Sequence, residues 1–301
     1  MWRLLGLLSS LFAGIPPALA DTINVDTATG PALVETAPET IAVFDAPAID
    51  TLEALGVTVD AAPAPLYLDY LEDYVKDATR VGTLFEPDYE ALAVLAPDLI
   101  IAGSRSATQV EALGQIAPTL DMSIWGTDMV AQTIIRLHTY GAIFDRKSEA
   151  EKQIAILKTA IADAQNAVAG KGKALILLTN GGKISAYGDD SRFGWLHTAT
   201  GLPEAYPAVS AQTHGEAISF EFIAELDPDW LLVIDRGAAV GASGAAARAT
   251  LDNRLMAKTK AARKQQIVYL SAGPLYIAGG GVQSMLISLE ELTEAFSGGG
   301  F

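Results

Sequence analysis

The stretch FEPDYEALAVLAPDLIIAGSR (residues 85–105) returns later in the chain as ISFEFIAELDPDWLLVIDR (residues 218–236). The offset of 131 positions that aligns the two Pro-Asp pairs also superposes Glu90 on Glu221. Each copy predicts a helix that opens with an acidic residue, followed by Pro-Asp and a buried strand. Because one pattern occurs twice, we expect two similar lobes.

Short apolar runs alternate with helical patterns on both sides of each copy. Runs typical of buried strands cover residues 41–44, 99–102, 174–178, 231–234 and 267–270, and helical patterns between them include 47–55, 88–95 and 220–226. Alternating strands and helices predict an α/β fold with mainly parallel sheets.

One helical pattern is much longer than the others. Residues 147–168 run without Gly or Pro, and Ile154, Leu157, Ile161 and Val168 fall on one face at spacings of three, four and seven. At 1.5 Å per residue, this helix would extend about 33 Å. We expect it to join the lobes, and an ordinary long surface helix is the alternative. The resulting boundaries are an N-terminal lobe at 38–146, the inter-lobe helix at 147–169 and a C-terminal lobe at 170–301.

The first 20 residues predict a signal peptide. Arg3 precedes an apolar run over 4–15, and Ala18-Leu19-Ala20 fits the small-x-small pattern that signal peptidase cleaves. The run is shorter than the roughly 20 residues of a membrane span, although a retained anchor is the alternative. Residues 21–37 predict a flexible N-terminal lead-in or an edge strand. Because the chain has no Cys that could carry a lipid, we expect a soluble periplasmic monomer.

Charge and motifs exclude several classes of function. The net charge of −16 disfavours nucleic acid and anionic lipid as partners, although clustered arginines can reverse the field in one cleft. Gly279-Gly280-Gly281 lacks the Lys-Ser/Thr of a phosphate-binding P-loop, and the chain contains no GxSxG nucleophile motif. We therefore expect a binding protein and not an enzyme.

Arg105 and Arg236 end the two repeated units, one in each predicted lobe. Ligands of α/β sheets bind beyond the carboxyl ends of the strands, which is where both arginines follow their strands. The sequence therefore predicts a cleft between the lobes, with cationic groups facing one another across it.

Further motifs carry a resemblance to a known family. They are SAYGDDSRFGWLH (185–197), THGEAISFEFI (213–223), DPDWLLVIDRG (227–237), LDNRLMAKTKAA (251–262) and VYLSAGPLYIAGGG (268–281). In this order, over about residues 40–296, they resemble the helical-backbone (class III) periplasmic binding proteins, in particular the branch that binds ferric catecholate siderophores for ABC importers. The resemblance implies an α/β fold of two Rossmann-like lobes joined by one long inter-lobe helix.

The resemblance also implies the ligand site. Arg105, Arg192 and Arg236 match the three arginines that hold the ferric complex in the branch, and three guanidinium groups suit a triply anionic ferric tris-catecholate. His214 and Tyr276 match a pair that completes the iron coordination when the siderophore is tetradentate, or else lines the pocket. The ligand would be the ferric siderophore itself, with no permanently bound cofactor.

The resemblance assigns a docking role to two carboxylates as well. Glu90 and Glu221 match the acidic residues, one on each lobe, that contact the importer permease in the inner membrane. An acidic residue at a helix start also favours the helix dipole without any partner. Two other functions remain open at this point: a haem- or cobalamin-type ligand in the same fold, or an interaction module that binds no small molecule.

Overall fold

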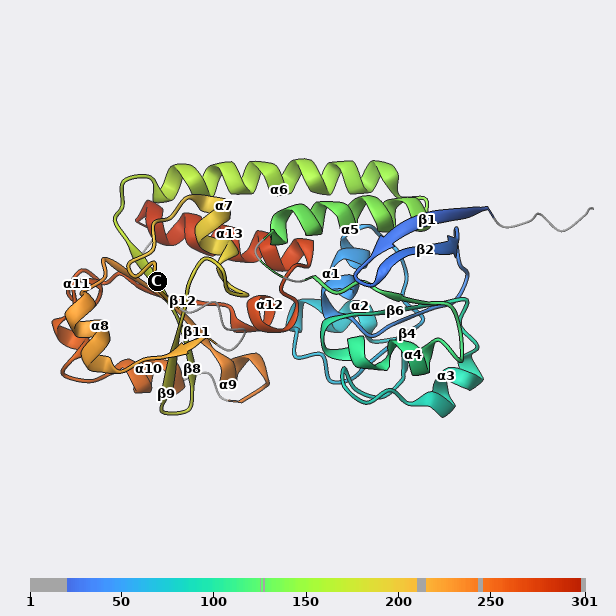
Figure 1. The fold of residues 1–301 in the computed structure, drawn as a ribbon, viewed down its shortest axis with the longest axis horizontal. Helices are drawn as coiled ribbons and strands as arrows, with labels where there is room; N and C mark the ends of the chain where they lie inside the picture. The colour runs from blue at the N-terminus through green and yellow to red at the C-terminus, as the bar shows by residue number, and fades with distance from the viewer. Residues whose placement is uncertain (1–20, 125, 127, 210–214, 243–245, 299–301) are drawn as a thin grey trace, which may run out of the picture.

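The computed structural model describes residues 21–124, 126, 128–209, 215–242 and 246–298. It has two lobes side by side, each built around its own sheet, with one long helix running over both (Figure 1). The predicted α/β fold with two lobes is confirmed. Residues 1–20, where the sequence predicts a signal peptide, lie outside the described residues. None of the described helices is both long enough and apolar enough to cross a membrane.

The N-terminal lobe contains a five-stranded parallel sheet. Its strand order is β5-β4-β3-β6-β7. The strands are β3 (Ile41–Val43), β4 (Ala61–Ala62), β5 (Thr79–Arg80), β6 (Leu99–Ala102) and β7 (Thr119–Asp121). In this sheet β3 lies at the centre. Strands β4 and β5 follow on one side of it, and β6 and β7 lie on the other side.

The C-terminal lobe repeats this plan with one change. Its strand order is β10-β9-β8-β11-β12; β8, β11 and β12 are parallel, whereas β9 runs antiparallel to both of its neighbours, β8 and β10. The strands are β8 (Ala174–Asn180), β9 (Lys183–Tyr187), β10 (Glu216–Ala217), β11 (Trp230–Asp235) and β12 (Ile267–Leu270). A tight β8–β9 hairpin thus stands where the other lobe has a crossover.

The central strands are apolar on both faces because each sheet is covered on both sides. In β11, Leu231 and Val233 pack into one cluster and Leu232 and Ile234 into another. Successive strand residues point to opposite faces, so a continuous apolar run is what a doubly covered strand requires. This explains why the strands at residues 41–44, 99–102, 174–178, 231–234 and 267–270 could be predicted from apolar runs.

Helices cover both sheets and fill the space between the lobes. The α-helices are α1 (Ala46–Ala54), α2 (Glu72–Val75), α3 (Tyr89–Leu95), α4 (Val110–Leu113), α5 (Met129–Ile143), α6 (Lys147–Val168), α7 (Trp195–Thr200), α8 (Phe220–Leu226), α9 (Arg236–Ala239), α10 (Ala246–Leu251), α11 (Lys260–Arg263), α12 (Ala272–Ile277) and α13 (Val282–Ser297). Three short 3-10 helices are η1 (Asp69–Leu71), η2 (Ser104–Gln109) and η3 (Met256–Lys258).

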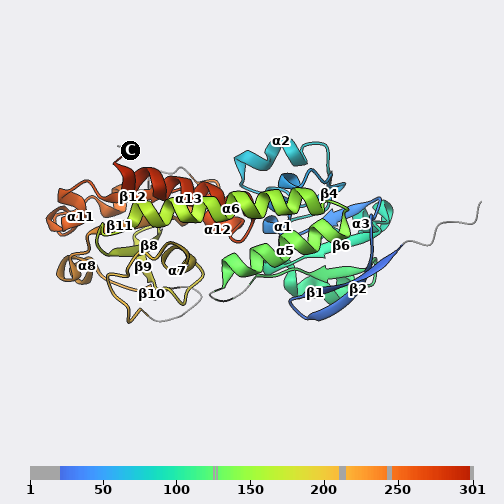
Figure 2. The same cartoon turned by 90° about the horizontal axis from the view of Figure 1, so that it is seen from above.

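Helix α6 is the predicted inter-lobe helix, and its bounds agree with the sequence pattern. It lies along one side of the molecule, over α5 of the first lobe and α13 of the second (Figures 1 and 2). Ile154, Leu157 and Val168 are buried on the face that packs on these helices. A continuous 22-residue helix has no flexible joint, so it restricts how far the lobes can move apart.

Helix α13 ties the end of the chain to the first lobe. Asp50, in α1, is fully buried, and its carboxylate accepts hydrogen bonds from the backbone N–H of Gln283 (2.8 Å) and Ser284 (2.9 Å) and from the Tyr70 hydroxyl (2.6 Å). The two backbone donors belong to the first turn of α13, where helix N–H groups have no partner within the helix. The N-terminal lobe thus supplies the cap for a helix that packs in the C-terminal lobe.

The internal repeat has a direct structural counterpart at the ends of α3 and α8. Asp88 and Ser219 are their N-cap residues, and each side chain accepts a hydrogen bond from the backbone N–H three residues later. Ala96 and Asp227 end these helices in the left-handed conformation. Both pairs are separated by the same 131 positions as the Pro-Asp pairs.

The aspartate of each Pro-Asp pair holds the backbone at the start of the neighbouring central strand. The Asp98 carboxylate accepts from the backbone N–H of Thr40 (2.8 Å), which directly precedes β3, and Asp229 accepts from Lys173 (3.0 Å), which directly precedes β8. In each lobe, the repeated aspartate therefore holds the first strand of the five-stranded sheet next to the strand that follows the aspartate: β3 beside β6, and β8 beside β11.

Residues 21–37, for which the sequence left a flexible lead-in or an edge strand open, form a hairpin of β1 (Thr22–Thr27) and β2 (Gly30–Glu35). Val25 and Val34 are buried against the N-terminal lobe. The Ala28 N–H donates to the Asp121 carbonyl (2.8 Å), which fastens the hairpin to the end of β7. The strand alternative describes this segment, because alternate apolar residues give the hairpin a buried face.

Candidate functional site

The chain reverses its direction of strand addition at one place in each sheet. In the N-terminal lobe this place lies between β3 and β6, and in the C-terminal lobe between β8 and β11. Crevices beyond the carboxyl ends of strands at such switch points are where open α/β sheets bind ligands. Arg105 follows β6 in η2, and Arg236 is the first residue of α9 directly after β11. Both predicted arginines therefore stand at switch points.

The backbone around Arg105 is held by short polar contacts. Gly103 approaches so closely that an added Cβ would lie 2.9 Å from the Asp45 carboxyl, so a side chain has no room there. The Ser104 N–H donates to the Ser123 hydroxyl (2.7 Å), and the Gly103 N–H donates to the Ser106 hydroxyl (3.0 Å). The η2 turn thus presents the Arg105 side chain from a fixed base.

Arg105 reaches from its own lobe to the other. Its guanidinium donates to the Tyr276 carbonyl (2.6 Å) and to the Ile277 carbonyl (3.0 Å), both in α12 of the C-terminal lobe. Arg192, in the loop between β9 and α7, donates to the same Tyr276 carbonyl at 2.9 Å. The end of α12 therefore brings two guanidinium groups from different lobes together.

Tyr276 is the point on which all three predicted arginines converge. The centre of its ring lies 5.5 Å from the guanidinium carbon of Arg105, 4.6 Å from that of Arg192 and 5.8 Å from that of Arg236. The Nε of Arg236 donates to the Tyr276 hydroxyl at 3.1 Å. These distances fall within the range of cation–π attraction. Four of the five predicted ligand residues therefore form one cluster.

The cluster is electrostatically unbalanced. Burial lowers the pKa of Arg105, and the neighbouring charge of Arg192 lowers it further; burial also lowers the pKa of Arg192. Within the described part of the chain, none of the three arginines forms an ion pair with a carboxylate. Like charges held together and partly desolvated favour the entry of an anion that neutralises them.

A hollow of about 450 Å³ opens beside this cluster and is lined by both lobes. Its lining residues are Phe85, Ser104, Arg105, Ile124, Gly126, Met129, Asp190, Ser191, Arg192, Leu275, Tyr276, Ile277 and Gly279. This volume is in the range of small-molecule sites. We call it the arginine hollow; Arg105, Arg192 and Tyr276 line it, and Arg236 adjoins it through its hydrogen bond to the Tyr276 hydroxyl.

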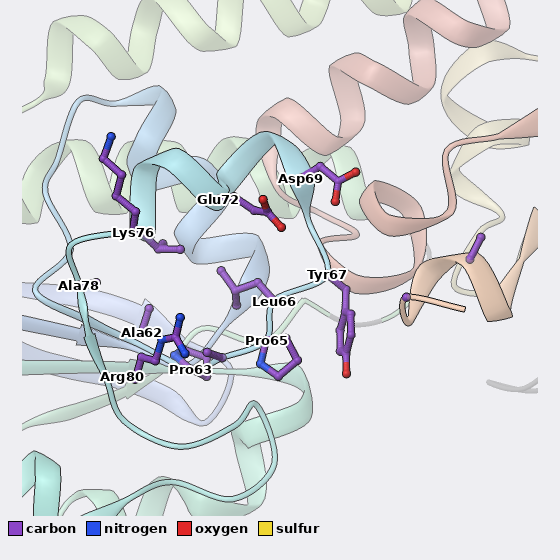
Figure 3. A pocket seen from close by; sticks show the side chains of 14 residues that line it. Ala62, Pro63, Pro65, Leu66, Tyr67, Asp69, Glu72, Lys76, Ala78 and Arg80 are labelled. Carbon is purple, nitrogen blue, oxygen red and sulfur yellow. The ribbon is translucent and has the colours of Figure 1, made fainter. Parts of the chain in front are cut away.

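A second hollow of about 720 Å³ lies beside α2, and Ala238 and Gly241 of the C-terminal lobe are among its lining residues. In Figure 3, Asp69 and Glu72 lie on its α2 side, and Arg80 lies across from them near Pro63. Although this hollow is larger, its lining contains no residue of the arginine cluster. Its charges are exposed and of both signs. The arginine hollow is therefore the candidate site.

Comparison with known proteins agrees with this geometry. The sequence profile of the periplasmic binding protein family matches residues 41–273, which include both central sheets and all three arginines of the cluster. The chain belongs to this family. Its two lobes, joined by α6 and with the site between them, have the helical-backbone (class III) form of the periplasmic binding protein fold.

Several relatives of this periplasmic binding protein have names that state a ligand. The petrobactin-binding protein YclQ of Bacillus subtilis is 32% identical over 261 residues, covering 85% of this chain and 82% of YclQ. Its crystal structure matches with a TM-score of 0.85 over 92% of this chain and 99% of that one. The ferric-anguibactin-binding protein FatB of Vibrio anguillarum is 27% identical, covering 92% and 88%. The catecholate-siderophore binding protein VctP of Vibrio cholerae matches at 28% identity with a TM-score of 0.83, covering 90% and 99%.

The remaining predicted residues of this periplasmic binding protein lie elsewhere. His214 lies outside the described residues. Glu90 and Glu221 are exposed, and each is the second residue of its helix, α3 or α8, one helix in each lobe. They occupy equivalent places on the two lobes, as the repeat predicts.

Most of the residues that line the hollow were not singled out by the sequence analysis, and Phe85 and Asp190 are among them. Asp190 lies two residues before Arg192, so the DDSR segment was a usable signal. Phe85 opens the first copy of the repeat, where an aromatic residue precedes Glu-Pro-Asp-Tyr. That position could have been noted, but only the fold shows that it lines the same hollow as Arg105 and Arg192.

Proposed function

We propose that this periplasmic binding protein captures a ferric siderophore of the catecholate type in the arginine hollow and delivers it to an ABC importer. The observation that carries the proposal is the convergence of three guanidinium groups from two lobes on Tyr276. A ferric tris-catecholate is triply anionic, so it would neutralise all three. The ligand names of YclQ, FatB and VctP support a siderophore as the cargo.

The arginines suit a catecholate complex because of their donor geometry. A guanidinium presents five N–H groups in a plane and keeps its charge in proteins. Arg105 uses part of this set on the Tyr276 and Ile277 carbonyls, and Arg192 uses one nitrogen on Tyr276. Those bonds orient the side chains, and the remaining N–H groups are left for the catecholate oxygens of the ligand.

Tyr276 offers a second kind of contact. Its hydroxyl accepts a hydrogen bond from Arg236, and a guanidinium donor stabilises negative charge on a phenolate oxygen. Phenolate oxygen is a hard donor of the kind Fe³⁺ prefers. With a tetradentate siderophore, which leaves two coordination positions open on the iron, we assign one to Tyr276 and the other to His214. With a hexadentate siderophore, both side chains only line the site.

Release to the importer involves only small movements of the lobes. Helix α6 is continuous across them, and the Asp50 carboxylate joins α1 to the start of α13. The mature protein, freed of residues 1–20, acts as a monomer in the periplasm. It docks on the permease through Glu90 and Glu221, which are exposed at matching positions of the two lobes.

Titration of purified mature protein tests the ligand. Quenching of tryptophan fluorescence is followed as ferric tris-catecholate, ferric trihydroxamate and haemin are added. We expect saturable binding of the tris-catecholate, tighter than of the other two. Preferred binding of haemin would overturn the siderophore assignment, and indifference to all three would overturn ligand capture in this site.

Charge reversal tests the docking role separately. The double variant Glu90→Arg, Glu221→Arg should keep the wild-type affinity for the ferric complex but fail to support iron uptake in cells that carry the importer. Glu111→Arg, another change at an acidic first-turn residue of the N-terminal lobe, in α4, is the control and should transport normally. Unimpaired uptake by the double variant would remove the docking assignment and leave the ligand assignment intact.

A further inference from the structure

Phe85 gives the arginine hollow an aromatic wall. Its side chain is 60% exposed, yet it is one of the N-terminal lobe residues that line the hollow with Arg105. A phenyl ring left in contact with water forgoes the stabilisation that burial would give it. Exposed apolar side chains at a concave polar site are typical of residues that a ligand covers.

The exposure of Phe85 is imposed by a well-ordered turn. The Thr83 hydroxyl accepts hydrogen bonds from the backbone N–H of Phe85 (3.2 Å) and of Glu86 (3.0 Å), and the Thr83 N–H donates to the Glu86 carbonyl (2.9 Å). The Gln109 amide donates to the Phe85 carbonyl at 3.3 Å, and Gln109 in turn accepts from the Tyr89 hydroxyl at 2.7 Å. These bonds hold the backbone on both sides of Phe85 in the turn in which its ring is exposed.

The lining of the hollow combines two kinds of chemistry. Arg105 and Arg192 supply cationic groups, beside one carboxylate from Asp190, whereas Phe85, Ile124 and Met129 supply apolar surface. An anion without apolar surface, such as a small carboxylate chelate, would use only the cationic groups. This lining suits a ligand that carries both anionic oxygens and a flat apolar surface.

We infer that Phe85 is a specificity-determining residue that packs against an aromatic ring of the bound ferric chelate. This inference rests on the proposed function and names the ligand class more narrowly. A catecholate ring carries both of its oxygens on one edge, so when they face the arginines and the iron, its carbon–hydrogen edge and faces point away from them. An offset or edge-to-face contact with Phe85 then covers both rings.

Three substitutions at this one position test the inference. Phe85→Ala removes the ring, Phe85→Leu keeps apolar bulk without a ring, and Phe85→Tyr keeps the ring. Affinity for ferric enterobactin, used as the tris-catecholate probe, is measured by fluorescence titration with the full mature protein. We expect Ala and Leu to weaken binding about 10-fold, equivalent to about 1.4 kcal/mol, and Tyr to stay within about 2-fold of wild type.

Val94→Ala provides the matched control, because Val94 is an 88% exposed apolar residue of α3 that does not line the hollow. It should leave the affinity unchanged, and thermal melts establish that every variant is folded. Wild-type affinity in the Leu variant would show that any apolar side chain suffices and would overturn the ring contact, as would wild-type affinity in the Ala variant. If the wild-type protein itself ignores the tris-catecholate, the proposed catecholate function fails and this inference fails with it.

Discussion

Arg236→Ala is the substitution that most directly tests the shared anion site. Arg236 donates from Nε to the Tyr276 hydroxyl at 3.1 Å, and its guanidinium carbon lies 5.8 Å from the centre of the Tyr276 ring. Its only other described hydrogen bond is long, 3.5 Å to the Asn180 amide oxygen. Unlike Arg105, it does not hydrogen-bond across the lobes, so its loss should leave the fold intact.

The expected size of the effect follows from the contacts that would be lost. A hydrogen bond to a charged group in a desolvated site contributes about 1.5–3 kcal/mol. At 1.4 kcal/mol for each tenfold change, the dissociation constant for a ferric tris-catecholate should rise about 10- to 150-fold. Arg236→Ala also removes the hydrogen bond to the Tyr276 hydroxyl. This loss raises the dissociation constant further only for ligands whose iron is coordinated by Tyr276.

Arg248→Ala is the matched control for this experiment. Arg248 also belongs to the C-terminal lobe and also stacks on a tyrosine, but that tyrosine is Tyr269, 4.0 Å away at its ring centre, and not Tyr276, on which the cluster converges. The control removes the same charge and the same kind of aromatic contact. Both variants are titrated with the ferric complex at two salt concentrations. Equal affinities for Arg236→Ala and Arg248→Ala would refute the arginine cluster as the ligand site.

Three more predictions concern the site and the fold. Tyr276→Phe should raise the dissociation constant of a tetradentate ferric catecholate about 10- to 100-fold while a hexadentate complex stays near the wild-type value; equal losses for both complexes would exclude direct ligation. Gly281→Ala places a Cβ 2.5 Å from a buried carboxyl and should lower the free energy of unfolding by about 1–3 kcal/mol in urea titration, whereas Gly182→Ala, which meets nothing within 4 Å, should not. Burial raises the pKa of Asp45 to about 7. Its contribution to the free energy of unfolding is therefore complete below pH 3.8, the pKa of this group in the unfolded chain, and is lost as the pH rises toward 7. Asp45→Asn does not titrate, so its melting temperature relative to that of the wild type should rise between pH 4 and pH 7; a constant difference would contradict this.

The fold was largely predictable because its signals are local. Buried central strands must be apolar on both faces, so β6 and β11 stand out as short apolar runs, and α6 shows a single apolar face without Gly or Pro. The β8–β9 hairpin was not predicted. Antiparallel pairing depends on which strand lies beside β8, and an apolar run such as residues 174–178 does not indicate which strand that is. The hairpin at 21–37 stayed ambiguous for the same reason.

The site was predictable in part because the repeat marks the ends of two strands. Arg105 and Arg236 follow from that mark and from the position of switch points, whereas Arg192 and Tyr276 came from the family resemblance alone. The sequence did not indicate how close these four side chains lie to one another in space. The carbonyl of Tyr276 that receives both Arg105 and Arg192 lies far from each along the chain, and Phe85 is an ordinary aromatic residue until the turn at Thr83 places it at the hollow.

The cap that Asp50 provides for α13 has a consequence for how the molecule is made. A buried carboxylate near the start of the chain finds two of its donors only at Gln283 and Ser284, close to the other end. During synthesis, this carboxylate therefore lacks two of its hydrogen-bond donors until residues 283 and 284 have been made. Truncations that stop before α13 should leave an incomplete first lobe that is prone to proteolysis, even though every strand of its sheet would be present.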